Sequence, residues 1–399
     1  MANPVESGRR KRIVVYCQHL SGAGHYVRCR EIVRALSRRH DVWFVVGGSD
    51  VPGPKLAGSV SLVQLPAIHR TAVGLAPLDS SQTLAEVFGQ RRFVLDRLLG
   101  ELSPDLLLIE HFPFSKWVLR DELTAAIKAA KSANSRVKVV SSVRDYPAGH
   151  EASTASAEFR NEVVPTLNAM FDLLLVHSDP RVVRLETLFP WMSQVAIPVH
   201  YTGYVSEKLA DPEKGSGPQY DAAPGYVLVS SGGLRDGNRL ANLCVAAWKE
   251  IDASSRAGRR MVIFTGLFAE PRQLDALQIS IQGQNSIQEG AFELRRFSDG
   301  FLPWMAGADM SISQGGYNTT MNLLETRTRG ILAPNRRTYD QPLRARRLAE
   351  WGVFDAITPE TATAGELAEL ILAGLSRPRP IHEIAPDGAE QTLTLMDTL

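Results

Sequence analysis

The chain has 399 residues, 44% of them hydrophobic and 22% charged, which is ordinary for a globular protein of two domains. A formal net charge of +1 gives no reason to expect nucleic acid as the main partner, and three cysteines without a CxxC pair exclude a disulfide framework. No apolar run reaches the ~20 residues of a membrane span, and the polar N-terminus lacks the apolar core of a signal peptide. We therefore expect a cytoplasmic protein, with peripheral membrane contact left open.

Apolar runs and amphipathic stretches alternate along the first half of the chain. The apolar runs predict buried strands over residues 12–17, 41–46, 60–65, 105–110, 137–142 and 172–176. Helical patterns between them cover residues 26–38, 84–99, 118–133 and 157–170. Strands that alternate with helices predict a parallel, doubly wound α/β sheet.

A stretch with several proline and glycine breaks separates this unit from a second one of the same kind. The strands of the second unit are predicted over residues 226–230, 261–265, 286–291, 309–313, 330–334 and 353–357. Its helices are predicted over residues 240–251, 317–326 and 366–375, with others beginning near Pro342 and residue 390. We therefore predict domains over residues 1–202 and 224–375, a linker over 203–223 and a tail over 376–399.

The loop after the first strand reads SGAGH, and its glycines, Gly22 and Gly24, permit a tight turn before the next helix. A dinucleotide-binding loop is the obvious alternative. However, Val27 stands where the G-x-G-x-x-G pattern needs its last glycine, and the second strand ends without an acidic residue. The sequence therefore disfavours NAD binding.

Polar residues close two strands of the first unit. Glu110 and His111 end the strand at 105–110, and Arg144 and Asp145 follow the strand at 137–142. The carboxyl ends of parallel strands form the ligand-binding edge of such a sheet. Glu110 is thus a candidate to take up a proton or to orient a base, and a solvated loop charge is the equal alternative. Arg144 and Asp145 either line a pocket or form a surface ion pair.

Two glycine turns end strands of the second unit. One follows residues 226–230, and the other, Gly315-Gly316, opens the helix at 317–326. Such a turn leaves backbone N–H groups free at the positive end of the helix dipole, which is a ready site for a phosphate. The next strand leads to Asp340 and Gln341, one of which is expected to cap the helix that contains Pro342.

The stretch from 309 to 347 resembles the nucleotide-sugar half of the GT-B glycosyltransferases, especially the MurG-like enzymes of family 28. Three residues match the family's strand-end turn: Ser313, Gly315 and Gly316. Glu325 matches the helical glutamate that holds the ribose hydroxyls, and Asp340 with Gln341 matches the pair that reads the sugar. The resemblance covers residues 225–354 well and the first half mainly at its first loop. It implies two Rossmann-like domains that face a cleft, and a tail that returns to the first domain.

The resemblance implies donor-binding residues in both glycine turns and beyond them. In the first turn they are Ser231, Gly232, Gly233 and Arg235; around the second they are Ser313, Gln314, Gly315, Gly316, Asn318, Thr319, Glu325, Asp340, Gln341 and Arg344. Arg235 is a candidate for a bidentate bond to a phosphate, and Arg344 lies about one turn beyond Gln341.

In the first unit the resemblance places the SGAGH loop beside the acceptor, with His25 as the candidate general base because imidazole titrates near neutrality. A structural histidine is the alternative. Glu110 is the second catalytic candidate. The acceptor-binding candidates are Gly22, Gly24, His111, Arg144 and Asp145.

The implied activity is transfer of a sugar from a nucleoside-diphosphate sugar to a small-molecule or lipid-linked acceptor, with inversion. No D-x-D pair occurs, so we expect neither a metal nor a cofactor beyond the sugar nucleotide. Two alternatives stay open: a nucleotide-sugar 2-epimerase-like isomerase, and a non-catalytic protein that binds nucleotide sugars. The acceptor, the sugar, the base and the oligomeric state are not specified by the sequence.

Overall fold

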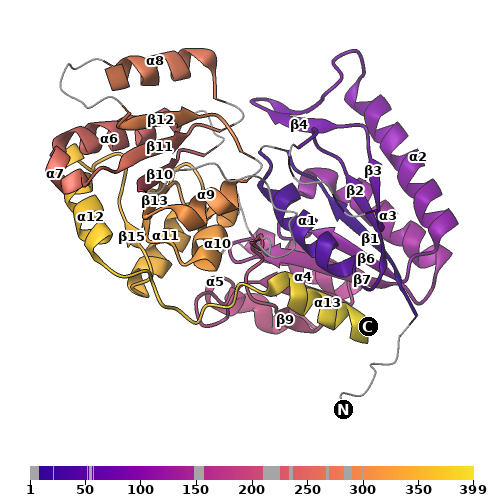
Figure 1. Ribbon diagram of the computed structural model, residues 1–399. Helices are drawn as coiled ribbons and strands as arrows, with labels where there is room; N and C mark the ends of the chain where they lie inside the picture. Colours follow the sequence, from indigo (N-terminus) through magenta and orange to yellow (C-terminus); the bar gives the residue numbers. More distant parts are fainter. Residues whose placement is uncertain are drawn as a thin grey trace. The chain divides into compact units, whose positions relative to one another are not determined.

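The chain folds into two compact α/β units (Figure 1). The computed structural model describes residues 9–20, 22–51, 53, 56, 58–147, 157–209, 225–232, 237–266, 269–282, 290–298 and 300–399. Unit 1 contains Met1–Ser206 and Ala385–Leu399, and unit 2 contains Glu207–Ile384. Most of the predicted linker, from residue 210 onward, lies outside the described residues.

Unit 1 is built on a seven-stranded parallel sheet with the order β3-β2-β1-β6-β7-β8-β9. Its strands are β1 (Arg12–Cys17), β2 (Asp41–Val46), β3 (Val60–Gln64), β6 (Leu106–Glu110), β7 (Lys138–Arg144), β8 (Leu173–His177) and β9 (Val199–Tyr201). A separate antiparallel hairpin consists of β4 (Ile68–Thr71) and β5 (Gly74–Pro77). The predicted doubly wound parallel sheet is confirmed.

Helices cover both faces of this sheet, and successive residues of β1 show the alternation. Val14 and Tyr16 face a core shared with α2 (Leu84–Leu102), α3 (Arg120–Ala133) and α4 (Ala157–Met170). Ile13 and Val15 face the core under α1 (Gly24–Leu36) and α13 (Gly388–Thr398). Short turns occur at η1 (Trp117–Leu119), α5 (Leu185–Leu188) and η2 (Pro190–Gln194). Both faces are therefore buried, as the continuous apolar runs indicate.

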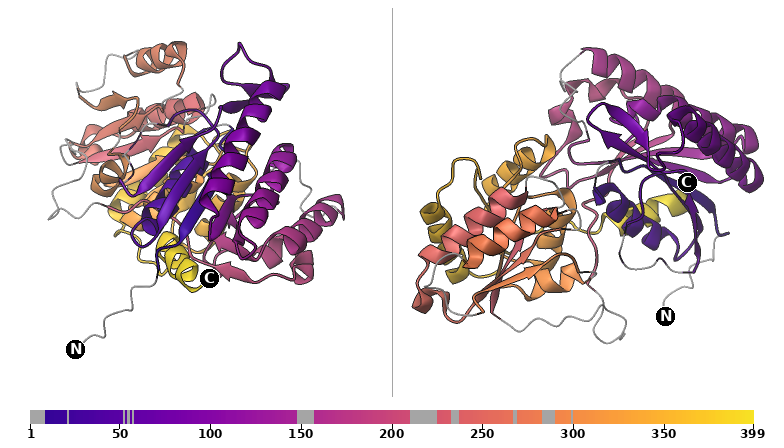
Figure 2. Two further views of the ribbon diagram at one scale, coloured as in Figure 1. Left: turned by 90° about the vertical axis from the view of Figure 1, so that its right-hand side faces the viewer. Right: turned by 90° about the horizontal axis from the view of Figure 1, so that it is seen from above.

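The helix α13 belongs to unit 1 although it follows unit 2 in the chain. This helix, coloured yellow in Figure 2, packs against α1. Its residues Leu393 and Met396 are buried in the core that α1 covers. The Lys11 ammonium donates to the Met396 carbonyl at 2.7 Å, and His40 contacts Asp397 at 2.9 Å. Residues far apart in the sequence thus complete one face of the sheet.

A buried arginine holds together the loops at one end of this sheet. Arg91, on α2, is fully buried and donates to both carboxylate oxygens of Glu122 on α3, at 2.7 and 2.8 Å. Its guanidinium also donates to the Tyr16 hydroxyl and to Gln18 Oε1 after β1. Further bonds reach the carbonyls that follow β2 and β3, those of Gly47 and Pro66. One charged side chain therefore ties three successive strand ends to two helices.

Unit 2 has a six-stranded parallel sheet with the order β12-β11-β10-β13-β14-β15. The strands are β10 (Tyr226–Ser230), β11 (Arg260–Phe264), β12 (Phe292–Arg295), β13 (Met310–Ser313), β14 (Gly330–Leu332) and β15 (Asp355–Ala356). The helices are α6 (Gly237–Glu250), α7 (Ala253–Arg256), α8 (Pro271–Gln282), α9 (Phe301–Gly307), α10 (Tyr317–Thr326), α11 (Asp340–Glu350) and α12 (Ala364–Ser376). Among the described residues of both units, no helix combines the length and apolarity needed to cross a membrane.

Three local predictions are wrong. The strand expected over 286–291 is β12, at Phe292–Arg295, and residues 283–289 lie outside the described part of the chain. The hairpin of β4 and β5 lies between the predicted strand at 60–65 and the predicted helix at 84–99, where no strand was expected. Neither Asp340 nor Gln341 caps α11, because the N-cap residue is Tyr339 and its side chain makes no capping bond. Asp340 pairs with Arg344 instead.

Candidate functional site

The strand orders locate a candidate site in each unit. In unit 1 the chain runs from β1 to β2 on one side, while β6 lies on the other side of β1. In unit 2 the strand β10 has the same position between β11 and β13. Ligands of open α/β sheets bind at such switch points, outside the carboxyl ends of the strands. The candidate sites therefore lie at the loops after β1 and β6 in unit 1 and after β10 and β13 in unit 2.

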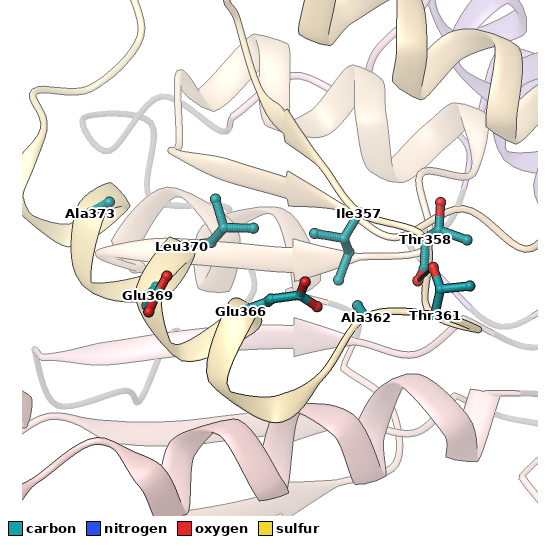
Figure 3. Close-up of a pocket in the computed structure, with 8 residues that line it drawn as sticks. All are labelled: Ile357, Thr358, Thr361, Ala362, Glu366, Glu369, Leu370 and Ala373. Carbon is teal, nitrogen blue, oxygen red and sulfur yellow. Dashed lines mark hydrogen bonds between the residues drawn. The ribbon is translucent and has the colours of Figure 1, made fainter.

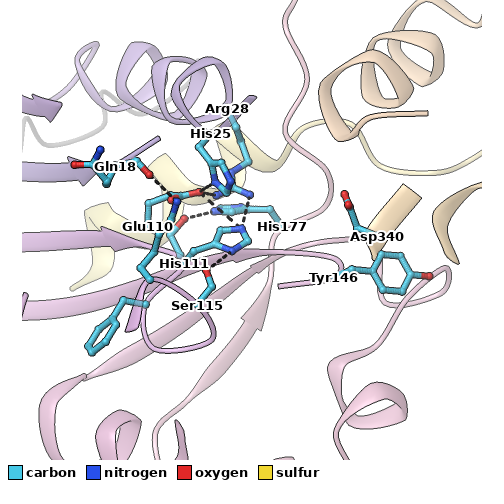
Figure 4. Close-up of polar contacts among 12 residues, drawn as sticks. Gln18, His25, Arg28, Glu110, His111, Ser115, Tyr146, His177 and Asp340 are labelled. Carbon is cyan, nitrogen blue, oxygen red and sulfur yellow. Dashed lines mark hydrogen bonds and ion pairs between the residues drawn. The ribbon is translucent and has the colours of Figure 1, made fainter. Parts of the chain in front are cut away.

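In unit 1 the two catalytic candidates are in direct contact (Figure 4). His25, near the N-terminus of α1, bonds through Nδ1 to Oε1 of Glu110 at the end of β6. Arg28, one turn further along α1, donates to the same oxygen at 2.5 Å. It also donates to His111 Nε2 at 3.2 Å. The sequence pattern gave no sign of Arg28, because an arginine on an amphipathic helix ordinarily faces solvent.

These contacts fix the protonation states of the group. A carboxylate on Nδ1 requires the Nδ1–H tautomer of His25 and leaves the Nε2 lone pair available. Burial lowers the pKa of His25 to about 4, against the opposing effect of Glu110. Burial alone would raise the pKa of Glu110, but His25, His111 and Arg28 hold it well below its ordinary value. His25 is thus neutral, and Glu110 ionised, at neutral pH.

The loop after β6 holds two residues in the left-handed region of backbone space. His111 has φ +64° and Lys116 has φ +69°, a conformation that costs energy for residues other than glycine. Phe112 and Phe114 anchor the loop in the core. Lys116 donates to the Gln18 carbonyl at 2.7 Å, so its ammonium lies at the end of β1. No motif in the sequence indicates a role for Lys116.

The remaining candidates of unit 1 lie at neighbouring positions. Arg144 is the last residue of β7 and is half-buried, and the Asp145 carboxylate accepts from the Tyr146 N–H at 3.0 Å. Gly22 has φ +74°, which a glycine adopts without strain. Gly24 is the first residue of α1.

A second buried histidine follows β8. His177 bonds to Ser142 Oγ at 2.7 Å and to Thr202 Oγ1 at 2.8 Å, which joins the ends of β7, β8 and β9. Burial and the Arg28 charge hold its pKa well below the ordinary value.

Three potential metal-ligand atoms, from His25, Glu110 and His111, lie within 4.8 Å of one another. However, the Arg28 guanidinium contacts both Glu110 and His111. A cation would have to displace this guanidinium and break two hydrogen bonds. The arrangement therefore suits a neutral histidine base better than a metal centre.

In unit 2 the two glycine turns are in close contact. Gly232, after β10, has φ +74°, and a Cβ atom there would lie 2.5 Å from Oε1 of Gln314. Gly315, after β13, has φ +70°. A Cβ on Gly316 would lie 3.9 Å from Nε2 of Gln341. The turns after β10 and β13 and the start of α11 thus meet at one edge of the sheet. Gly233 and Arg235 lie outside the described residues.

Arg344 connects two of these segments. It is 1% exposed, donates to the Gly315 carbonyl at 3.1 Å and to Asp340 at 2.9 Å, and packs over the Tyr317 ring. Gln341 accepts from the Asn335 N–H at 3.0 Å. Arg344 therefore holds the second glycine turn and Asp340 in fixed relation.

The helix α10 begins directly after the second turn, with Gly316 as its N-cap. Asn318, Asn322 and Glu325 share one face, because they are spaced four and three residues apart. Ser313 is buried at the end of β13, and Thr319 is half-buried in the first turn of the helix. Glu325 pairs with Lys208 at 2.6 Å. Asn322 is 4% exposed, and its Oδ1 has no hydrogen-bond partner among the described residues. Asn322 is not among the donor-binding residues that the sequence predicts.

A separate groove of about 690 Å³ lies beside α12 (Figure 3). It is lined by Ile357, Leu370 and the carboxylates of Glu366 and Glu369 among others. None of the predicted site residues lines it. The groove therefore has no part in the chemistry considered below.

Comparison with known proteins identifies a family model for the second half of the chain and solved structures with a similar fold. Residues 227–392 match the model of the glycosyltransferase family 28 C-terminal domain. No curated protein sequence matches the chain. The fold is similar to MurG of Acinetobacter baumannii, with 13% identity, coverage of 98% of this chain and 100% of that chain, and a TM-score of 0.59. It is also similar to the calicheamicin glycosyltransferase CalG4, with 15% identity, 98% and 95% coverage and a TM-score of 0.56. The glycosyltransferase VinC in complex with DTDP has 16% identity to this chain and a TM-score of 0.55, with coverage of 97% of this chain and 96% of that chain.

Proposed function

Residues 227–392 match the family 28 C-terminal domain, and the fold is similar to that of GT-B glycosyltransferases; we propose that this chain is itself a glycosyltransferase, which transfers a sugar from a nucleoside-diphosphate sugar to an acceptor hydroxyl. Unit 2 would bind the donor and unit 1 the acceptor. The observation that carries this proposal is the bond between His25 and Glu110 at the switch point of unit 1. That bond orients an imidazole whose other nitrogen is available as a base.

The proposed reaction is a single displacement. His25 Nε2 accepts the proton of the acceptor hydroxyl, and the oxygen attacks the anomeric carbon. The bond from that carbon to the phosphate oxygen breaks, and the nucleoside diphosphate leaves with the electron pair, so the anomeric centre inverts. Glu110 keeps the imidazole in the required tautomer and stabilises its protonated form.

The donor is proposed to lie along α10. Its phosphates would lie at the N-terminus of α10, beside the turn Gly315-Gly316, where the helix dipole favours negative charge. The sugar would lie beside Asp340 and Gln341. Arg344 would act by holding these segments rather than by contacting the donor, because it is buried and bonded to both.

Glu325 is proposed to bind the ribose hydroxyls of the donor, because it lies about two turns along the same face as Asn318. Glu325→Ala should weaken binding of the nucleoside diphosphate by about ten- to a hundredfold, since a charged hydrogen bond contributes roughly 1.5–3 kcal/mol. Calorimetric titration with a panel of nucleoside diphosphates measures this. Glu369→Ala, which removes an exposed glutamate of the groove beside α12, is the matched control and should leave the affinity unchanged. Wild-type affinity in a folded Glu325→Ala protein would show that Glu325 does not bind the ribose. Asn322, on the same face of α10, would then be the next residue to substitute.

Transfer of a radiolabelled sugar, with release of free sugar as the control, tests the proposed function itself. A panel of nucleotide sugars and hydroxyl acceptors is needed, since neither substrate is identified. Conversion of the sugar nucleotide without any acceptor would favour the epimerase-like alternative. Tight donor binding without transfer or conversion would favour the non-catalytic alternative.

Activity is expected to survive EDTA, and we propose no cofactor beyond the sugar nucleotide. The leaving diphosphate would be stabilised by backbone N–H groups and the dipole of α10 in place of a divalent cation. The measurement compares initial transfer rates after dialysis against EDTA with and without added magnesium or manganese. Complete loss on chelation that either metal restores would contradict this expectation.

A further inference from the structure

The charges around His25 do not balance. Glu110 supplies one negative charge, and Arg28, which is 2% exposed, neutralises it through a direct ion pair. Burial is the main cause of the low pKa of His25, and the positive charges of Lys116 and Arg144 lower it further, so both charges act on the imidazole. The described residues of unit 1 therefore present more positive than negative charge at this site.

The excess positive charge at this site is that of Lys116. It is half-buried, and its one hydrogen bond goes to the neutral carbonyl of Gln18. Among the described residues it makes no ion pair with a carboxylate, although the charge of Glu110 bears on it. If the negative charge of Asp145 offsets the positive charge of its neighbour Arg144, no described carboxylate is left to offset the charge of Lys116.

The other titratable groups that face this site in the described part of the chain do not supply the missing charge. His111 and His177 stay neutral because burial holds their pKa values well below 6.5. His19 is also shifted toward the neutral form by burial. Burial raises the pKa of the Cys17 thiol well above its ordinary value. A half-buried ammonium without an anionic partner is costly, and an anion placed beside it restores the balance.

We propose that the acceptor's nucleophile is an acidic hydroxyl, such as that of a phenol or an enol, which this site stabilises as its oxyanion. The inference rests on the proposed function and specifies the chemical class of its acceptor. The O–H proton passes to His25 Nε2, the oxyanion faces the ammonium of Lys116, and the oxygen attacks the anomeric carbon as the diphosphate leaves. An aliphatic alcohol gains less from such a site, because it holds its proton far more tightly.

The low basicity of His25 agrees with this acceptor class. Burial, together with the positive neighbours, opposes a positive charge on the imidazole, so His25 accepts a proton readily only from an acidic donor. The strained backbone of Lys116 also fits a site that places its ammonium for a ligand.

The test uses 4-nitrophenol as the probe, because its anion absorbs visible light and its neutral form does not. The pH is set about one unit below the pKa of the free phenol. Bound to the wild-type protein, the probe should show the phenolate band, because a nearby positive charge lowers an acid's pKa by about 1–3 units. Lys116→Met should lose most of this band and bind the probe about tenfold more weakly. Lys128→Met, an exposed lysine on α3, should leave the band unchanged.

Each outcome decides between the alternatives. Absence of the phenolate band in the wild-type protein would overturn the proposal. So would an unchanged band in a folded Lys116→Met protein, or equal affinity for the non-acidic analogue 4-nitrobenzyl alcohol. Because the probe needs no donor, a phenolate band in a protein that transfers no sugar would reject the transferase proposal and leave the anion site standing.

Discussion

His25→Ala is expected to lower turnover by about 10²–10⁴-fold while leaving the affinity for the nucleoside diphosphate nearly unchanged. The reason is that the variant removes the group that accepts the acceptor's proton, and that group belongs to unit 1, whereas the proposed donor residues belong to unit 2. Steady-state transfer rates and calorimetric titration of the diphosphate measure the two effects separately. With an acidic acceptor, the loss should become smaller as the pH approaches the acceptor's own pKa.

Two further variants make this result specific. Glu110→Gln keeps the size of the side chain but removes the charge that sets the imidazole tautomer, so it should also slow transfer. His200→Ala changes an exposed histidine of the same unit and should have no effect. Unchanged turnover in His25→Ala would remove His25 from the mechanism. Glu110 would then be the base, and its Oε2, which has no hydrogen-bond partner among the described residues, is the atom to consider.

Arg91→Met should destabilise unit 1 by about 3–5 kcal/mol, because it removes one partner of a buried ion pair and leaves the other charge unpaired. Glu122 loses both of its bonds to the guanidinium, and the carbonyls of Gly47 and Pro66 each lose the bond that Arg91 donates. Chemical denaturation followed by tryptophan fluorescence gives the change in the free energy of unfolding.

The neighbouring residue supplies the control for this experiment. Arg92 is exposed and pairs with Asp96 one turn along the same helix at 2.6 Å. Such surface pairs contribute about 0.3–0.5 kcal/mol, so Arg92→Met should change stability little. Equal effects of the two substitutions would contradict the role assigned to Arg91. The double variant Arg91→Met with Glu122→Met removes both charges and should recover part of the loss.

The sequence predicts strands such as β1 and β10 to the residue because continuous apolar runs have no other stable location. It fails for the β4–β5 hairpin, whose short segments are only partly buried and carry no long apolar run. It also fails for Arg28 and Arg91. Their positions on amphipathic helices are those of ordinary surface arginines, and only the tertiary structure brings carboxylates to them.

The face of α10 proposed to bind the donor also shows what the sequence alone does not predict. Helical spacing puts Asn318, Asn322 and Glu325 on one side, but it does not tell which of them is buried or paired. In the structure Glu325 has a lysine partner, whereas the side chain of Asn322 is buried with an unmatched oxygen. The roles of both therefore stay predictions that binding measurements must decide.

The place of α13 in unit 1 has a consequence for how the protein is made. Unit 1 is the first to be synthesised, yet Leu393 and Met396 of its core follow the whole of unit 2 in the chain. At about 5–20 residues per second, a ribosome needs roughly 10–40 s to add the ~180 residues of unit 2. During that interval the apolar side of α1 that α13 will cover is exposed on the nascent chain. This surface is where a chaperone would bind and where two unfinished chains would associate, so the growing polypeptide is most vulnerable before α13 is made.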